Sequence, residues 1–130
     1  MKIIIIFFGI FIMAPSIALA DICSKSNIDL RWSGGSAKFS VELADNEAKR
    51  AQGLMFRKTL GKFSGMIFVY PSEQSVNFWM RNTLIPLDIL FFDSKGTLKK
   101  IHQNAQPLDL SSLFGGDGIQ YVLEINGGMV

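Results

Sequence analysis

The side chains best suited to chemistry lie close together in one otherwise apolar block of the chain. Trp79, Asn82 and Asp88 belong to this block, Arg81 follows the tryptophan, and Arg57 lies earlier in the sequence. An indole ring can stack on a flat ligand such as a sugar ring, while amide and guanidinium groups orient that ligand by hydrogen bonds. These five residues are therefore the predicted ligand-binding residues. The predicted partner is a small molecule, with carbohydrate as one candidate class.

Two of these positions also have purely structural explanations. Asp88 interrupts the apolar run Leu84–Phe92, and a buried carboxylate is costly unless it is paired, hydrogen-bonded or protonated. An ion pair with Arg57 or Arg81, or hydrogen bonds from backbone N–H groups, would satisfy Asp88. Trp79 could likewise be covered by a helix or a loop. The sequence leaves these alternatives open.

Motifs of known catalytic machinery are missing from the sequence. Neither Gly-x-Ser-x-Gly nor His-Glu-x-x-His occurs, and no phosphate-binding loop or dinucleotide fingerprint is present. A carboxylate pair for hydrolysis could combine Asp88 with one of three glutamates, which are Glu42, Glu73 and Glu124. Glu124 falls on the strand face opposite Leu123, which indicates a solvated position. We therefore expect no cofactor and no metal site, and the catalytic residues stay unknown.

The first twenty residues have the composition of an export signal. Lys2 precedes the apolar run Ile3–Ala14, and Ala18-Leu19-Ala20 matches an A-x-A cleavage site. The apolar run is about twelve residues long, whereas a membrane-spanning helix needs about twenty. We therefore expect cleavage after Ala20 and no stable membrane insertion afterwards. The predicted location is the periplasm or the extracellular space.

The charge of the chain argues against one class of partner. The chain has 13 basic and 11 acidic side chains, and no basic run is longer than two residues. Nucleic-acid binding needs a basic stripe that neutralises phosphates, so we expect no nucleic-acid partner. Composition divides the chain into a signal peptide (1–20), a flexible leader (21–36) and a single globular domain (37–130).

Apolar runs of two kinds, alternating and continuous, predict a sheet with one short helix. The expected strands are 37–44, 65–70, 75–81, 84–92, 97–102 and 119–125. Pro71 is expected to end the second strand, and Asp45 is the expected N-cap of a helix over 46–52. Turns are expected at 93–96 and at the glycine-rich residues 115–118. The predicted fold class is α+β and β-rich: a small curved antiparallel or mixed sheet, or a barrel-like domain, of about six strands.

Four blocks of sequence together resemble a known family. They are Gly53–Arg57 (GLMFR), Gly65–Phe68 (GMIF), Phe78–Phe91 (FWMRNTLIPLDILF) and Tyr121–Gly128 (YVLEINGG). On these blocks the chain from Phe39 to Gly128 is similar to the domain-of-unknown-function family 192, a widespread and often exported family. The resemblance implies a compact β-rich domain and supplies no reaction. In this family a further segment follows the last strand, so the end at Val130 implies a chain truncated at its C-terminus.

Three functions are consistent with these observations, and the sequence does not decide among them. The leading hypothesis is a non-catalytic ligand-binding or accessory module of the cell envelope, with a cleft near Trp79, Asn82 and Asp88. The first alternative is an envelope hydrolase in which Asp88 acts as acid or base. The second alternative is a structural or interaction protein that associates through a sheet edge.

Overall fold

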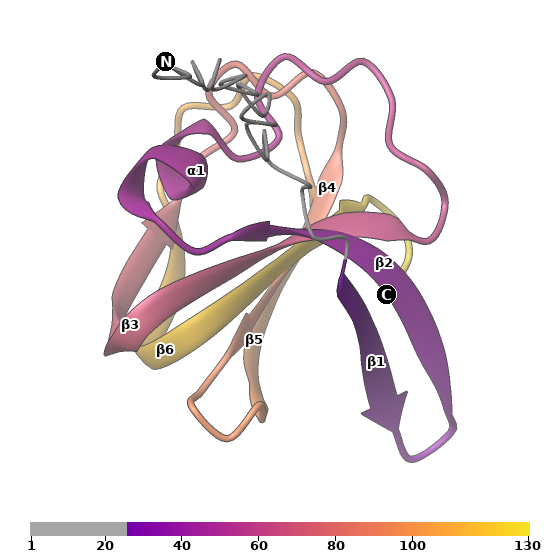
Figure 1. The fold of residues 1–130 in the computed structure, drawn as a ribbon. Coiled ribbons are helices and arrows are strands. Elements are labelled where there is room, and N and C mark those ends of the chain that lie inside the picture. Colours follow the sequence, from indigo (N-terminus) through magenta and orange to yellow (C-terminus); the bar gives the residue numbers. More distant parts are fainter. Residues whose placement is uncertain (1–25) are drawn as a thin grey trace, which may run out of the picture.

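The computed structural model describes residues 26–130, which form one six-stranded sheet and one short helix (Figure 1). The strands are β1 (Ser26–Trp32), β2 (Gly35–Ala44), β3 (Ser64–Phe78), β4 (Leu87–Phe92), β5 (Leu98–Ala105) and β6 (Leu113–Asn126), and the helix is α1 (Glu47–Gln52). The sheet is open, with the strand order β1-β2-β3-β6-β4-β5. The prediction of a β-rich α+β domain with a mixed sheet is confirmed.

The two longest strands, β3 and β6, form the centre of the sheet (Figure 1). They pair antiparallel from Gly65 opposite Ile125 to Phe78 opposite Leu113. The register of this pair shifts several times after Val69, and such irregularities bend a strand. β2 runs parallel to β3, whereas the remaining neighbours are antiparallel.

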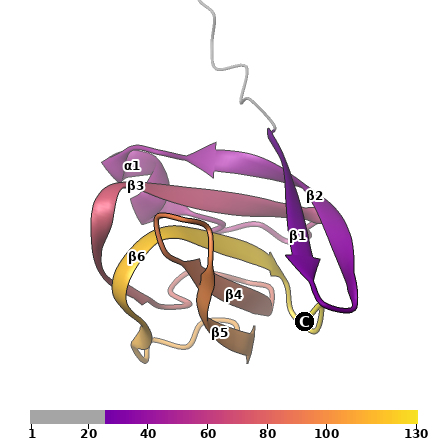
Figure 2. The same ribbon diagram turned by 90° about the horizontal axis from the view of Figure 1, so that it is seen from below.

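Each face of the sheet has its own apolar cluster. Side chains of a strand alternate between faces, so Leu123 and Ile125 of β6 join one cluster with Phe39. Val122 joins the other cluster with Phe68. The loop after α1 adds Leu54 and Leu60 to this second cluster, and Figure 2 shows α1 close to β3. The central strands are therefore covered on both faces.

The helix α1 has 6 residues, and its two ends are fixed by local contacts. The side chain of Asn46 accepts a hydrogen bond from the Lys49 N–H at 2.8 Å, so Asn46, and not Asp45 as expected, is the N-cap. Gly53 ends the helix with a φ of 49°, which a residue without Cβ adopts most easily. No helix within residues 26–130 is long and apolar enough to cross a membrane.

The prediction of a flexible leader up to residue 36 is wrong from residue 26 onward. Residues 26–32 form β1 and pair antiparallel with β2. Ile28 and Leu30 alternate with polar residues and pack against the cluster around Phe39, which gives this segment an apolar face. The predicted signal peptide and residues 21–25 lie outside the described residues.

The prediction that Pro71 ends a strand is also wrong, because β3 continues through it to Phe78. A proline lacks the N–H that a strand donates to its neighbour. The pairing of β3 with β6 is interrupted between Val69 and Gln74, so Pro71 lies where no N–H is required. The two expected strands, 65–70 and 75–81, are consequently one bent strand.

One of the two predicted turns is confirmed and the other is not. At 93–96 the N–H of Gly96 donates to the carbonyl oxygen of Asp93 at 3.1 Å, and β4 and β5 pair antiparallel on either side. Residues 115–118, by contrast, lie within β6. A Cβ on Gly115 would overlap the ring of Phe91, so a close approach between strands, and not a turn, requires this glycine.

Candidate functional site

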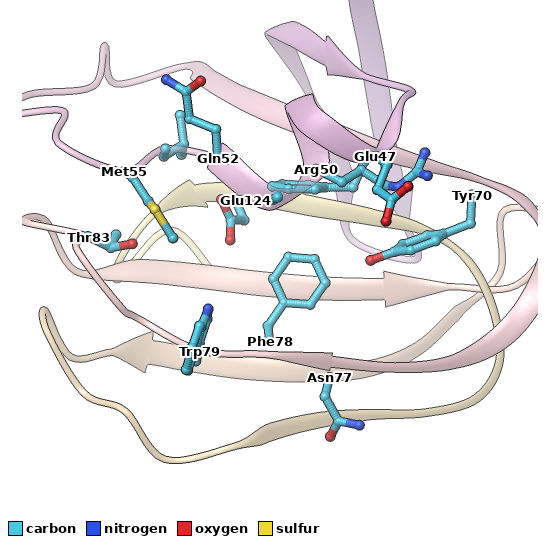
Figure 3. Close-up of a pocket in the computed structure, with 14 residues that line it drawn as sticks. Glu47, Arg50, Gln52, Met55, Tyr70, Asn77, Phe78, Trp79, Thr83 and Glu124 are labelled. Atoms are coloured by element: carbon cyan, nitrogen blue, oxygen red, sulfur yellow. The ribbon is translucent and has the colours of Figure 1, made fainter.

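A cavity of about 310 Å³ lies between α1 and the sheet. β3 contributes Phe68 and Tyr70 to its lining, β6 contributes Glu124, and the segment after β3 adds Trp79 and Thr83. Residues of α1 and of the turn that follows it complete the lining, and Figure 3 shows these side chains around one space. The volume falls at the lower end of the range for small-molecule sites, roughly 300–1,000 Å³.

Glu124 is the buried acidic residue of this cavity, with only 5% of its surface exposed. Its neighbours across the sheet are Met66 on β3 and Ile89 on β4, and Figure 3 shows its carboxyl group between Met55 and Phe78. No hydrogen bond or ion pair within residues 26–130 involves this carboxyl group. Burial therefore raises the pKa of Glu124 to about 8. Near neutral pH the group is mostly protonated and presents both a donor and an acceptor.

Arg50 and Tyr70 form a fixed pair in the lining. Nη1 of Arg50 donates to the carbonyl oxygen of Val69 at 2.8 Å, and the guanidinium carbon lies 5.0 Å from the centre of the Tyr70 ring. Burial raises the pKa of Tyr70, and this effect outweighs the opposing charge of Arg50. Tyr70 therefore remains a neutral phenol that can donate or accept a hydrogen bond.

Trp79 is the one predicted ligand-binding residue that lines the cavity. Its side chain is half exposed, at 46%, so it lies at the mouth rather than under a covering loop. The guanidinium carbon of Arg81 lies 5.2 Å from the centre of the indole ring, within the range of a cation–π contact. Arg81 orients Trp79 but is not itself part of the lining.

Asp88 lies away from the cavity and is fully buried. Its two carboxylate oxygens accept four backbone N–H groups at 2.7–3.1 Å, which belong to Asn104, Gly128, Met129 and Val130. Of the structural explanations considered above, hydrogen bonding to the backbone is the one observed. Its role in ligand binding stays a prediction.

Arg57 and Asn82 also lie outside the lining of the cavity. The two Nη atoms of Arg57 donate to the two carboxylate oxygens of Glu42 at 2.8 and 2.9 Å. The amide nitrogen of Asn82 lies 3.9 Å from the sulfur of Met55, which is a cavity residue. The structure thus brings Trp79 to the cavity, places Asn82 behind one wall and separates the other three, whose contact with a ligand stays a prediction.

Three ionisable residues of the cavity, which are Glu47, Arg50 and Tyr70, were not predicted as site residues, and Glu124 was considered only as a carboxylate partner of Asp88. The interpretation of Glu124 as solvated is wrong, because β6 is a central strand and both of its faces are covered. In a strand that is buried on both faces, the alternation of side chains does not show which residues are exposed to solvent. A usable signal existed: Glu124 interrupts the apolar run Val122–Ile125 in the way that Asp88 interrupts its own run.

The groups in the cavity suit an organic ligand. Within residues 26–130 no group of three or more His, Cys, Asp or Glu is placed to hold a metal ion. The cavity offers instead aromatic rings, a phenol and a protonated carboxyl group.

Comparison with known proteins gives a family and two similar solved structures. The model of the DUF192 family, described as "Uncharacterized ACR", matches residues 29–130. A protein of unknown function from Novosphingobium aromaticivorans DSM 12444 is 42% identical with a TM-score of 0.77, covering 79% of this chain and 74% of that one. A protein from Sinorhizobium meliloti 1021, described as a proposed transcription regulator, is 38% identical with a TM-score of 0.76, covering 78% of this chain and 80% of that one. No curated protein matches the chain.

Proposed function

The chain belongs to the DUF192 family, a family of unknown function. We propose that its cavity binds a small organic amine. The protonated amino group lies against the carboxyl group of Glu124, and the organic part lies on the aromatic rings. In this proposal the protein is a non-catalytic binding or accessory module that is exported to the periplasm or the extracellular space. The observation that carries the proposal is the buried carboxyl group of Glu124, unpaired within residues 26–130, in a cavity of ligand size.

The acidic groups of the lining favour a cation once Glu124 ionises. Glu47 and Glu124 are acidic, and the one basic residue, Arg50, already contacts the carbonyl oxygen of Val69 and the ring of Tyr70. An ammonium group beside Glu124 favours the ionised carboxylate and so lowers the raised pKa. Binding therefore ionises Glu124 and releases its proton to the solvent. The buried carboxylate gains a partner that the protein alone does not provide.

The aromatic part of the lining suits the rest of such a ligand. Phe68, Tyr70, Phe78 and Trp79 all contribute, and aromatic faces attract both cations and apolar surfaces. The rings of Phe68 and Phe78 are 5.0 Å apart at 84°, so they hold each other in place before a ligand arrives. An arylalkylamine such as benzylamine, or an amino sugar, fits this arrangement, which keeps carbohydrate among the candidate classes.

The two alternative functions have less support. Asp88 is fully buried and its oxygens are occupied by four backbone N–H groups, so nothing in its surroundings favours the hydrolase. β1 and β5 end the described sheet, which keeps association through a sheet edge as an alternative. Export is supported by the sequence of residues 1–20.

The test compares pairs of compounds that differ by an amino group in place of a hydroxyl group. Benzylamine is compared with benzyl alcohol, and glucosamine with glucose. Thermal unfolding is measured on the chain from Asp21 onward, which keeps every strand and contact described above. An amine at a hundred times its Kd is expected to stabilise the protein by about 2.7 kcal/mol, and the hydroxyl compounds are expected to have no effect.

Two variants test whether the stabilisation by the amine depends on Glu124. Glu124→Gln keeps the size of the side chain but cannot ionise, so the shift of Tm by the amine is expected to disappear. Glu73→Gln changes an exposed glutamate outside the cavity and is expected to keep the full response. A response that survives in Glu124→Gln would contradict the site, and the absence of any response in the unmodified chain would overturn amine binding.

A further inference from the structure

Three loops meet at one end of the sheet, at the top of Figure 1. They are residues 53–63 after α1, residues 79–86 between β3 and β4, and residues 106–112 before β6. Three backbone hydrogen bonds join them: the N–H groups of Phe56, Leu108 and Met80 donate to the carbonyl oxygens of Asn82, Thr83 and Asp109, at 2.8, 3.1 and 2.9 Å. The three loops therefore form one continuous surface.

Six large apolar side chains in these three loops are exposed. Phe63 (51% exposed) lies next to β3, and its ring contacts the ring of Phe39 at 5.9 Å between centroids. The other five form what we name the apolar rim: Phe56 (65% exposed), Trp79 (46%), Leu84 (42%), Leu108 (57%) and Leu110 (65%). Single exposed apolar residues are ordinary on a protein surface. A group of five on three joined loops is different, because clustered apolar surface marks a contact with a partner or a membrane.

Two residues of the apolar rim have an unusual backbone. Phe56 has a φ of 64° and Leu108 a φ of 65°, a region that bulky residues rarely adopt and that asparagine tolerates. Both side chains are mostly exposed, so packing in the core does not explain these conformations. Unusual backbone conformations cluster at functional sites, and here they coincide with exposed apolar side chains.

Basic residues accompany the apolar rim. Residues 53–63 and 79–86 contain Arg57, Lys58, Lys62 and Arg81 and no acidic residue. The third loop has one acidic residue, Asp109, whose carboxylate accepts the N–H of Ser111. Arg57 is paired with Glu42, whereas Lys58, Lys62 and Arg81 are exposed. The surface is therefore apolar and positively charged.

We propose that the apolar rim docks reversibly on an anionic lipid membrane. Phe56, Leu108 and their neighbours enter the headgroup region, while the lysines and Arg81 contact lipid phosphates. Lysine is depleted at protein–protein interfaces, which favours a lipid surface over a protein partner. Trp79 belongs both to the apolar rim and to the mouth of the cavity, so docking places that mouth at the membrane. The proposal does not depend on amine binding.

The test is co-sedimentation with vesicles, using the chain from Asp21 onward so that the apolar run of residues 1–20 does not contribute. Vesicles of phosphatidylcholine containing about one-third phosphatidylglycerol are compared with phosphatidylcholine alone. Binding to the anionic vesicles is expected, with much weaker binding to the neutral ones. It is expected to fall when ionic strength rises from about 0.1 M to about 1 M, because the Debye length shortens from about 10 Å to about 3 Å.

The double variant Phe56→Asn with Leu108→Asn tests the surface without endangering the fold. Asparagine suits a positive φ, so the Tm is expected to stay equal or rise, while vesicle binding falls about tenfold or more because two apolar side chains are lost. The control is Leu98→Asn with Phe114→Asn, two residues outside the three loops that are 43% and 44% exposed, and it is expected to bind as the unmodified chain does.

Three results would overturn membrane docking. The first is an unmodified chain that does not sediment with anionic vesicles, and the second is a rim variant that sediments as well as the unmodified chain does. The third is a dimer in sedimentation velocity that the rim substitutions convert to a monomer while vesicle binding is absent, since the apolar rim would then be a contact between proteins.

Discussion

Oδ2 of Asp88 accepts a hydrogen bond from the backbone N–H of Met129 at 2.7 Å, and this contact ties the last residues of the chain to the core strand β4. The same carboxylate binds the N–H groups of Gly128 and Val130. The N–H of Gly127 donates to the carbonyl oxygen of Pro86 at 2.9 Å beside them. One buried side chain therefore substitutes for the neighbouring strand that this segment lacks among the described residues.

Asp88→Asn is expected to destabilise the protein. The amide keeps one acceptor oxygen and turns its NH₂ group toward backbone N–H groups, so at least one buried N–H loses its partner. Losing charge-assisted bonds of this kind costs about 2–4 kcal/mol of unfolding free energy. Urea unfolding followed by circular dichroism measures the change.

Asp109→Asn is the control for that measurement. Asp109 is exposed and accepts one backbone N–H, from Ser111, so its substitution is expected to cost well under about 1 kcal/mol. If Asp88→Asn were as mild as Asp109→Asn, the four hydrogen bonds would not be anchoring the C-terminal segment.

Gly115→Ala is expected to destabilise the fold by about 1–3 kcal/mol, because the new Cβ overlaps the ring of Phe91 in a packed core. Gly34→Ala, beside the exposed Trp32, is the control and is expected to cost less than about 0.5 kcal/mol. Adding Phe91→Leu to Gly115→Ala should recover part of the loss if the overlap is the cause. Equal costs for the two alanine variants would argue against the close approach.

The stability of the unliganded protein is expected to fall as pH rises from about 4.5 to about 8. In that window the Glu124 of the unfolded chain, with an ordinary pKa of 4.5, is ionised, whereas the buried group, with a pKa of about 8, keeps its proton. The folded state thus binds one proton more, and the unfolding free energy declines by up to about 1.4 kcal/mol per pH unit. Hydrogen bonds to Ser94 and Ser111 lower the pKa values of Glu73 and Asp109, respectively. These two groups therefore change the unfolding free energy only below this window.

Urea unfolding across this pH range, in parallel for the unmodified chain and for Glu124→Gln, measures that slope. The variant has no group to ionise at this position, so its profile is expected to be flatter. Parallel profiles for the two proteins would contradict the raised pKa of Glu124.

Asn46→Ala is expected to weaken both the fold and the cavity. It removes the acceptor of the Lys49 N–H at the start of α1, and losing such a cap costs about 1 kcal/mol. Because α1 supplies one side of the cavity, the affinity for benzylamine should fall as well. Calorimetric titration of the variant measures this, with Asn46→Ser, which restores a capping oxygen, as the control expected to recover affinity.

The sequence predicted the parts of the fold that depend on local patterns. The alternation in 37–44 is β2, and the short helix begins one residue from its expected start. Predictions failed where a distant contact decides the outcome. Pro71 is tolerated because β6 does not pair with β3 at that point, and Gly115 serves the packing of Phe91; neither partner is visible from the neighbouring sequence.

The same contrast between local patterns and distant contacts applies to the candidate site. Trp79 was predicted because an indole close to Arg81 and Asn82 in an otherwise apolar block is recognisable from sequence. Glu124 was not, because its burial depends on the position of β6 in the middle of the sheet. The strand order that places it there comes from pairings between segments far apart in the chain, which periodicity does not encode.

The most direct measurement is a pH titration of the Glu124 carboxyl carbon by NMR, with and without saturating benzylamine, using Glu124→Gln to assign the signal. The expected result is a pKa of about 8 in the free protein and a clearly lower pKa in the complex, because the ammonium group stabilises the carboxylate. A pKa that benzylamine does not move, or an ordinary glutamate pKa in the free protein, would contradict the assignment of Glu124 as the group that binds the amine.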